Sequence, residues 1–132
     1  MADLAVLFGG VGVGRRRGRV LGFPTANVEL EGPLPADLEG AVYAGRVKWD
    51  GSPGHDAVVN IGARPTFAEG GCSVEVHLLG FSGDLYGRRL EVRLLERLRP
   101  EQRFDSAEAL ISQIRRDIDQ ARAVLEREAQ RP

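Results

Sequence analysis

The chain has 132 residues, a formal net charge of −1 and an apolar fraction of 42%, which together predict a single domain, residues 1–132, with one hydrophobic core. The near-zero charge argues against nucleic-acid binding, and no apolar run approaches the roughly 20 residues that span a bilayer. The single cysteine, Cys72, excludes an internal disulfide, and Met1 to Phe8 lacks the pattern of a secretory signal. We therefore expect a cytoplasmic monomer that does not bind a membrane.

Short apolar segments separated by turn signals fill most of the chain. Asp50-Gly51-Ser52-Pro53-Gly54, for example, is a strong turn signal between two of them. The strands that we expect are Leu4 to Phe8, Val28 to Leu30, Ala41 to Trp49, Ala57 to Ile61, Ser73 to Leu79 and Leu90 to Leu98. Strands of this length and spacing predict a closed or nearly closed antiparallel barrel over about residues 4–98.

The C-terminal part has a different periodicity and predicts an amphipathic helix from Ser106 to about Glu126. Asp105 is the expected N-cap, because Glu108 follows three residues later in the capping-box position. One face of this helix should pack on the barrel through apolar residues at helical spacing, which are Ala107, Leu110, Ile111, Ile114, Ile118, Ala121 and Leu125.

A glycine- and arginine-rich region follows the first expected strand, and we expect it to form a loop or a strand broken by a loop. Its glycines, from Gly9 to Gly22, would let backbone N–H groups approach an anion. No Gly-Lys-Ser/Thr sequence follows, so this is not a Walker phosphate loop. The arginines at 15, 16, 17 and 19 either attract a polyphosphate or lie on a solvated loop.

Pro24 to Asn27 leads from this region into the second expected strand. Pro24 stiffens the backbone, and in an extended segment Thr25 and Asn27 would point to the same face. Two oxygen ligands beside an anion-binding loop suit a phosphate with a divalent metal. Taken alone, the spacing also fits an ordinary loop that enters a strand.

Several stretches in the same order along the chain resemble the riboflavin kinase family. They are Gly18-Arg19 with Leu21 to Asn27, Val42-Tyr43-Ala44-Gly45, Asn60-Ile61-Gly62 with Arg64-Pro65-Thr66-Phe67, Val74-Glu75-Val76-His77, Asp84-Leu85-Tyr86-Gly87, and Leu98-Arg99-Pro100-Glu101 with Phe104 and Asp117. The resemblance covers nearly the whole chain. It implies a mainly β fold, a six-stranded Greek-key antiparallel barrel with a C-terminal α-helix.

The same resemblance implies transfer of the γ-phosphoryl group of ATP to the 5′-hydroxyl of riboflavin, giving FMN and ADP, with Mg²⁺ as the metal. It implies that Glu75 is the general base, while Thr25 and Asn27 hold Mg²⁺ and the terminal phosphates. His77 would share the face of Glu75 and is expected either to be structural or to support a residue that contacts the substrate. In bacteria such a module is commonly one half of a bifunctional enzyme, and this chain resembles the kinase module alone.

Further site residues follow from the resemblance only. Gly18 and Gly22 would turn backbone N–H groups to the phosphates, and Arg19 is either a phosphate partner or an exposed charge. Tyr86 and Gly87 would lie beside the adenine. A flap near the flavin would contain Arg99, Glu101 and Phe104, although Phe104 also fits a hydrophobic staple beside the helix cap.

Two other functions remain open from the sequence. One is a flavin- or nucleotide-binding regulatory module without catalysis, which would bind FMN or riboflavin but release no ADP. The other is a structural barrel that binds a protein through its loops. The set of Thr25, Asn27 and Glu75 favours the enzyme over both.

Overall fold

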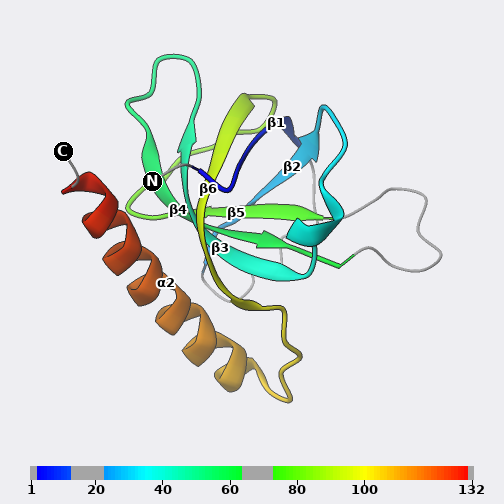
Figure 1. Ribbon diagram of the computed structural model, residues 1–132, viewed down its shortest axis with the longest axis vertical. Coiled ribbons are helices and arrows are strands. Elements are labelled where there is room, and N and C mark those ends of the chain that lie inside the picture. Colours follow the sequence, from blue (N-terminus) through cyan, green and yellow to red (C-terminus); the bar gives the residue numbers. More distant parts are fainter. Residues whose placement is uncertain (1–2, 13–22, 64–72, 131–132) are drawn as a thin grey trace.

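A computed structural model describes residues 3–12, 23–63 and 73–130 of the chain (Figure 1). Six strands form a closed barrel in the order β1-β2-β5-β4-β3-β6, and every neighbouring pair is antiparallel. The elements are β1 (Ala5–Gly12), β2 (Ala26–Leu30), the 3-10 helix η1 (Ala36–Leu38), β3 (Ala41–Lys48), β4 (His55–Ile61), β5 (Val74–Leu78), β6 (Arg89–Pro100) and α2 (Ala107–Ala129).

The chain path through the barrel is a Greek key. Strands β3, β4 and β5 follow one another as neighbours, and β6 then returns to pair with the free side of β3. Strand β6 is 12 residues long and pairs with β1 as well, so it closes the barrel. The predicted six-stranded Greek-key barrel with a C-terminal helix is confirmed.

The inside of the barrel is filled by aliphatic side chains that alternate along the strands. Val59, Val76, Val92 and Leu94 are at most 1% exposed, and the β-branched valines suit the pleated surface of a strand. Tyr43 is also buried, and its hydroxyl donates to the carbonyl of Leu38 at 2.8 Å. Burying each large aliphatic side chain contributes about 1.5–3 kcal/mol, so this core holds the strands in register.

Of the two alternatives for the region from Gly9 onward, the loop is wrong for residues 9–12, because β1 continues through Gly12. Gly9 and Gly12 pair with Leu30 and Asn27 of β2. A side chain on Gly9 would clash with the backbone carbonyl of Glu29. Glycine is therefore needed in this strand for the close approach of β2, and here it does not indicate a loop.

Helix α2 covers one outer side of the barrel (Figure 1) and packs on β3, β4 and β6. Its buried residues Ala121, Val124 and Leu125 meet Ala44 and Leu79 in a second apolar cluster. Two charged side chains strengthen this contact, because the Arg99 guanidinium binds both oxygens of the buried Asp117 at 2.8 Å. No helix in the described ranges is long and apolar enough to cross a membrane.

The predicted cap of this helix is off by one residue. Ser106 is the N-cap, with extended backbone angles, and its hydroxyl accepts from the backbone N–H of Ala109 at 3.1 Å. Glu108 is therefore only two residues from the cap, where it cannot complete the predicted capping box with Asp105. The helix also ends three residues later than predicted, at Ala129.

Candidate active site

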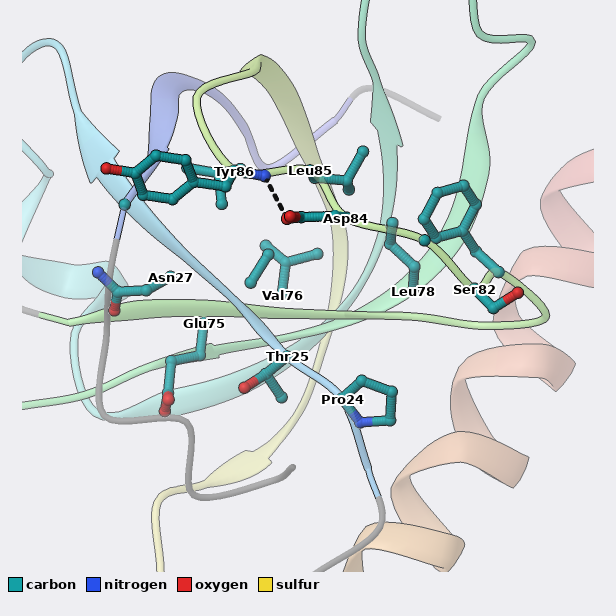
Figure 2. A pocket seen from close by; sticks show the side chains of 15 residues that line it. Pro24, Thr25, Asn27, Glu75, Val76, Leu78, Ser82, Asp84, Leu85 and Tyr86 are labelled. Atoms are coloured by element: carbon teal, nitrogen blue, oxygen red, sulfur yellow. Dashed lines mark hydrogen bonds between the residues drawn. The ribbon is translucent and has the colours of Figure 1, made fainter. Parts of the chain in front are cut away.

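A pocket of about 300 Å³ opens between the start of β2 and the segment that connects β5 to β6 (Figure 2). Residues 24–27 lie on one side of it, and residues 81–86 lie on the other side. Strand β5 passes between them and contributes Glu75, Val76 and Leu78. The end of β1 supplies Val11 and Gly12.

The polar side of the pocket is a row of residues across neighbouring strands. Asn27 of β2 is the register partner of Glu75 of β5, so the Cβ atoms of the two residues lie about 4.5–5.5 Å apart. Val74 and Val76, on either side of Glu75, point into the barrel core. Glu75 and Asn27 therefore project from the outer face, and both are half-buried.

Thr25 lies just before the first residue of β2 and joins this row. Figure 2 shows the Thr25 hydroxyl and the Glu75 carboxylate extending on the same side of the strands. Residues 25 and 27 thus share a face, as the extended segment predicted. The structure brings together three of the predicted site residues, all of which offer oxygen atoms.

The opposite side of the pocket is a tight turn that carries Tyr86. The Asp84 carboxylate accepts from the backbone N–H of Tyr86 at 2.9 Å, which fixes the turn (Figure 2). Tyr86 is 61% exposed and lines the pocket. Gly87 does not line the pocket; its φ of 82° ends the turn, and its N–H donates to the Val11 carbonyl at 2.9 Å.

Three predicted site residues lie elsewhere, at the junction of β6 with α2. Arg99 is paired with Asp117 of α2, and its guanidinium carbon lies 5.8 Å from the centre of the Phe104 ring. Glu101 accepts from the backbone N–H of Ala63 at 3.3 Å, just after β4. None of the three lines the pocket, and their place in a flavin flap stays a prediction.

Gly18, Arg19 and Gly22, like the arginines at 15–17, lie outside the described residues.

The sequence model of the riboflavin kinase family matches residues 5–125, which is nearly the whole chain. The chain belongs to the riboflavin kinase family. This membership agrees with the order of the motifs along the chain and with the barrel that they build.

Individual relatives agree with the family match. A bifunctional riboflavin kinase/FMN adenylyltransferase of Pseudomonas fluorescens is 50% identical over 114 residues, which cover 84% of this chain and 35% of that protein. Human riboflavin kinase is 40% identical over 114 residues, which cover 84% of this chain and 74% of the human protein. The chain therefore spans about a third of the length of the bifunctional relatives that it matches.

A solved structure supports the same fold. The crystal structure of riboflavin kinase from Trypanosoma brucei matches with a TM-score of 0.63 and 26% sequence identity, over 92% of this chain and 79% of that chain. The barrel and helix described above are thus shared with a structurally characterised member of the family.

The site residues suit a hard divalent cation that is held jointly with a substrate. Thr25 and Asn27 offer hydroxyl and amide oxygens beside the Glu75 carboxylate, and Mg²⁺ takes oxygen ligands. Within the described ranges no group of three or more His, Cys, Asp and Glu side chains could hold a metal by itself. This set fits Mg²⁺ bound through one or two protein oxygens plus phosphates and water.

Asn60 extends the polar row on the side of Glu75 that is away from Asn27. Its Oδ1 atom is buried, and no described residue donates a hydrogen bond to it. An unpaired buried acceptor costs about 1–3 kcal/mol, and Asn60 is not among the residues that line the pocket. In the sequence, Asn60 belongs to the Asn60-Ile61-Gly62 stretch and has no role of its own. The signal was a polar residue in the otherwise apolar run from Ala57 to Ile61.

Proposed function

We propose that the protein is a riboflavin kinase, which transfers the γ-phosphoryl group of ATP to the 5′-hydroxyl of riboflavin and gives FMN and ADP. The observation that carries the proposal is the pairing of Glu75 with Asn27, next to Thr25, in the pocket of a chain that belongs to this family. A carboxylate beside two neutral oxygen ligands is what an alcohol acceptor and a metal–phosphate donor require.

Glu75 would act on the acceptor hydroxyl. As the hydroxyl oxygen forms a bond to the γ-phosphorus, its proton passes to the Glu75 carboxylate, and the bond from the γ-phosphorus to the bridging oxygen breaks to release ADP. A positioned general base of this kind contributes about 10²–10⁴ in rate. The half-buried position of Glu75 at the pocket lets it contact a substrate without leaving the strand.

Thr25 and Asn27 would hold the donor end of the reaction. Their oxygens would bind Mg²⁺ and orient the terminal phosphates, and the metal when bound would neutralise charge on the phosphate oxygens. In phosphoryl transfer the attacking and leaving oxygens lie roughly in line with the phosphorus between them. The acceptor hydroxyl would therefore approach Glu75 from the side that faces away from Thr25 and Asn27.

The pocket wall beyond the phosphates would take the nucleoside. The ring of Tyr86 offers an apolar face at the pocket, beside Asn27 in Figure 2. The prediction that Tyr86 lies beside the adenine fits this position. Gly87 would contribute by holding the turn rather than by direct contact.

The test is incubation of the purified chain with riboflavin, ATP and Mg²⁺, followed by chromatography of flavins and nucleotides. The proposal predicts FMN and ADP in equal amounts, and no FMN when Mg²⁺ is chelated. Binding of riboflavin or FMN without ADP release would instead support a regulatory module, and the absence of any binding would contradict both.

A further inference from the structure

His77 of β5 makes a side-chain hydrogen bond to the segment that carries Thr25. Its Nδ1 atom lies 2.7 Å from the backbone carbonyl of Pro24. A carbonyl oxygen can only accept, so Nδ1 must carry the proton. The edge of the His77 ring also meets the ring of Phe23, with centroids 6.0 Å apart and an interplanar angle of 86°.

This contact lies where the β2–β5 ladder ends. The register pairs run from Val28–Val74 to Ala26–Val76, so residues 23–25 come before the paired part of β2. Pro24 has no N–H with which to extend the ladder. Within the described ranges no other side chain makes a hydrogen bond to residues 23–25.

We infer that His77 is a positioning residue that sets the place of the Thr25 hydroxyl relative to the Glu75 carboxylate. The carbonyl that His77 binds belongs to the residue directly before Thr25, and Glu75 is two positions earlier on the same face of β5. Strand β5 therefore carries both the Glu75 carboxylate and the His77 ring, which holds the segment that contains Thr25. This inference rests on the proposed function, in which Thr25 binds the Mg²⁺-nucleotide.

The first experiment compares two amides at position 77. His77→Asn puts an amide N–H close to where Nδ1 lies, whereas His77→Gln puts it close to where Nε2 lies, away from Pro24. We expect kcat/KM for Mg·ATP to fall by about 10- to 100-fold in His77→Gln and His77→Ala, and to stay within about threefold of wild type in His77→Asn. Equal losses in the Asn and Gln variants, or no loss in His77→Ala, would overturn the inference.

The matched control loosens the other end of β2. Glu31 follows the last residue of this strand and pairs with Arg89 of β6 at 2.5 and 2.9 Å, outside the pocket. Glu31→Gln weakens that contact and should leave kcat/KM for Mg·ATP near wild type. If it lowered kcat/KM as much as His77→Ala, general loosening of β2 would explain the result and the positioning role would be wrong.

Two further measurements separate positioning from a merely structural effect. If His77 acts through Thr25, His77→Ala should lower kcat/KM for Mg·ATP by less than about a further twofold in the Thr25→Ala background. If the two residues acted independently, the losses from the two substitutions would multiply. Long-range ¹H–¹⁵N NMR of the ligand-free chain should show the Nδ1–H tautomer of His77, and an Nε2–H tautomer would rule out the hydrogen bond.

The inference and the proposed function can fail separately. Calorimetric titration with Mg·ADP, without riboflavin, should rank the position-77 variants as the kinetics do. If wild type made no FMN, the proposed function would fail, and this titration together with the tautomer would still decide the role of His77. If wild type made FMN while the Ala, Asn and Gln variants bound Mg·ADP equally well, only the inference would fail.

Discussion

Strands β3 and β5 use their outer faces in opposite ways. On β3 both faces are buried, because Tyr43 and Val47 point into the barrel while Val42 and Ala44 are at most 1% exposed on the outside. On β5 only the inner face is closed, and the outer face presents Glu75 and His77. An outer face that a helix covers is apolar, and an outer face left open here carries the polar groups of the site.

The same contrast separates two kinds of polar contact. Arg99 and Asp117 lie between β6 and α2 with side chains 13% and 3% exposed, and each satisfies the other. Glu75 is half-buried, and no hydrogen bond or ion pair joins its carboxylate to another described side chain. A satisfied buried pair holds the helix in place, whereas a carboxylate at a pocket that no described side chain engages is open to a substrate on the described side.

The largest effect should come from removing the Glu75 charge. Glu75→Gln keeps the size of the side chain and should lower turnover by about 10²–10⁴ without changing the midpoint of thermal unfolding, because the outer face of β5 carries no core packing. Rates of FMN formation and a melting curve measure both quantities. Turnover near wild type would remove Glu75 as the base.

Breaking the buried ion pair should instead lower the stability of the fold. Asp117→Ala leaves the Arg99 guanidinium unpaired under α2 and should lower the free energy of unfolding by about 3–5 kcal/mol. Urea denaturation measures this change. As a control, Glu96→Gln removes an exposed contact to Arg127 of 3.8 Å and should cost less than about 1 kcal/mol. Equal costs for the two variants would contradict the contrast between buried and open contacts.

The two neutral residues that are proposed to bind Mg²⁺ should have an intermediate effect. Thr25→Ala and Asn27→Ala should each raise the Mg²⁺ concentration needed for half-maximal rate, by about tenfold if each loses one charge-assisted contact. A titration with Mg²⁺ at saturating ATP and riboflavin measures this. Unchanged Mg²⁺ dependence in both variants would count against the metal assignment.

The smallest effect concerns pH and the exposed pair at the far end of β2. The hydrogen bond from Arg89 holds the pKa of Glu31 below its ordinary value of 4.5. Because the pKa is lower in the folded state, the pair stabilises the fold above pH 4.5, and this contribution is lost as pH falls through the folded-state pKa. Melting curves of wild type and Glu31→Gln should differ slightly at pH 7 and converge in acid.

The sequence predicted the parts of the fold that depend on local patterns. Alternation of Val74, Val76 and Leu78 with polar residues predicted β5, and the helical period predicted α2. Local signals also misled at two places, since Gly9 lies within a strand and Ser106 rather than Asp105 caps the helix. Both depend on backbone geometry that residue type alone does not fix.

Contacts between distant parts of the chain could not be predicted from local patterns. The pairing of Asn27 with Glu75 depends on the β2–β5 register, and only the family resemblance connected the two residues beforehand. The bond from His77 to Pro24 and the pair of Arg99 with Asp117 likewise follow from how strands and helix meet. For Arg99, the place near the flavin that the family pattern predicts stays a prediction, and the side chain also binds Asp117 of α2.

The most direct test of the central claim follows the phosphoryl group itself. Wild type and Glu75→Gln should be incubated with riboflavin, Mg²⁺ and ATP labelled with ³²P at the γ-position, and the labelled products separated. The account predicts that label enters FMN in wild type, mole for mole with ADP, and that Glu75→Gln forms labelled FMN at least about 100-fold more slowly. Label released as inorganic phosphate without labelled FMN, or labelled FMN formed at equal rates by both proteins, would contradict it.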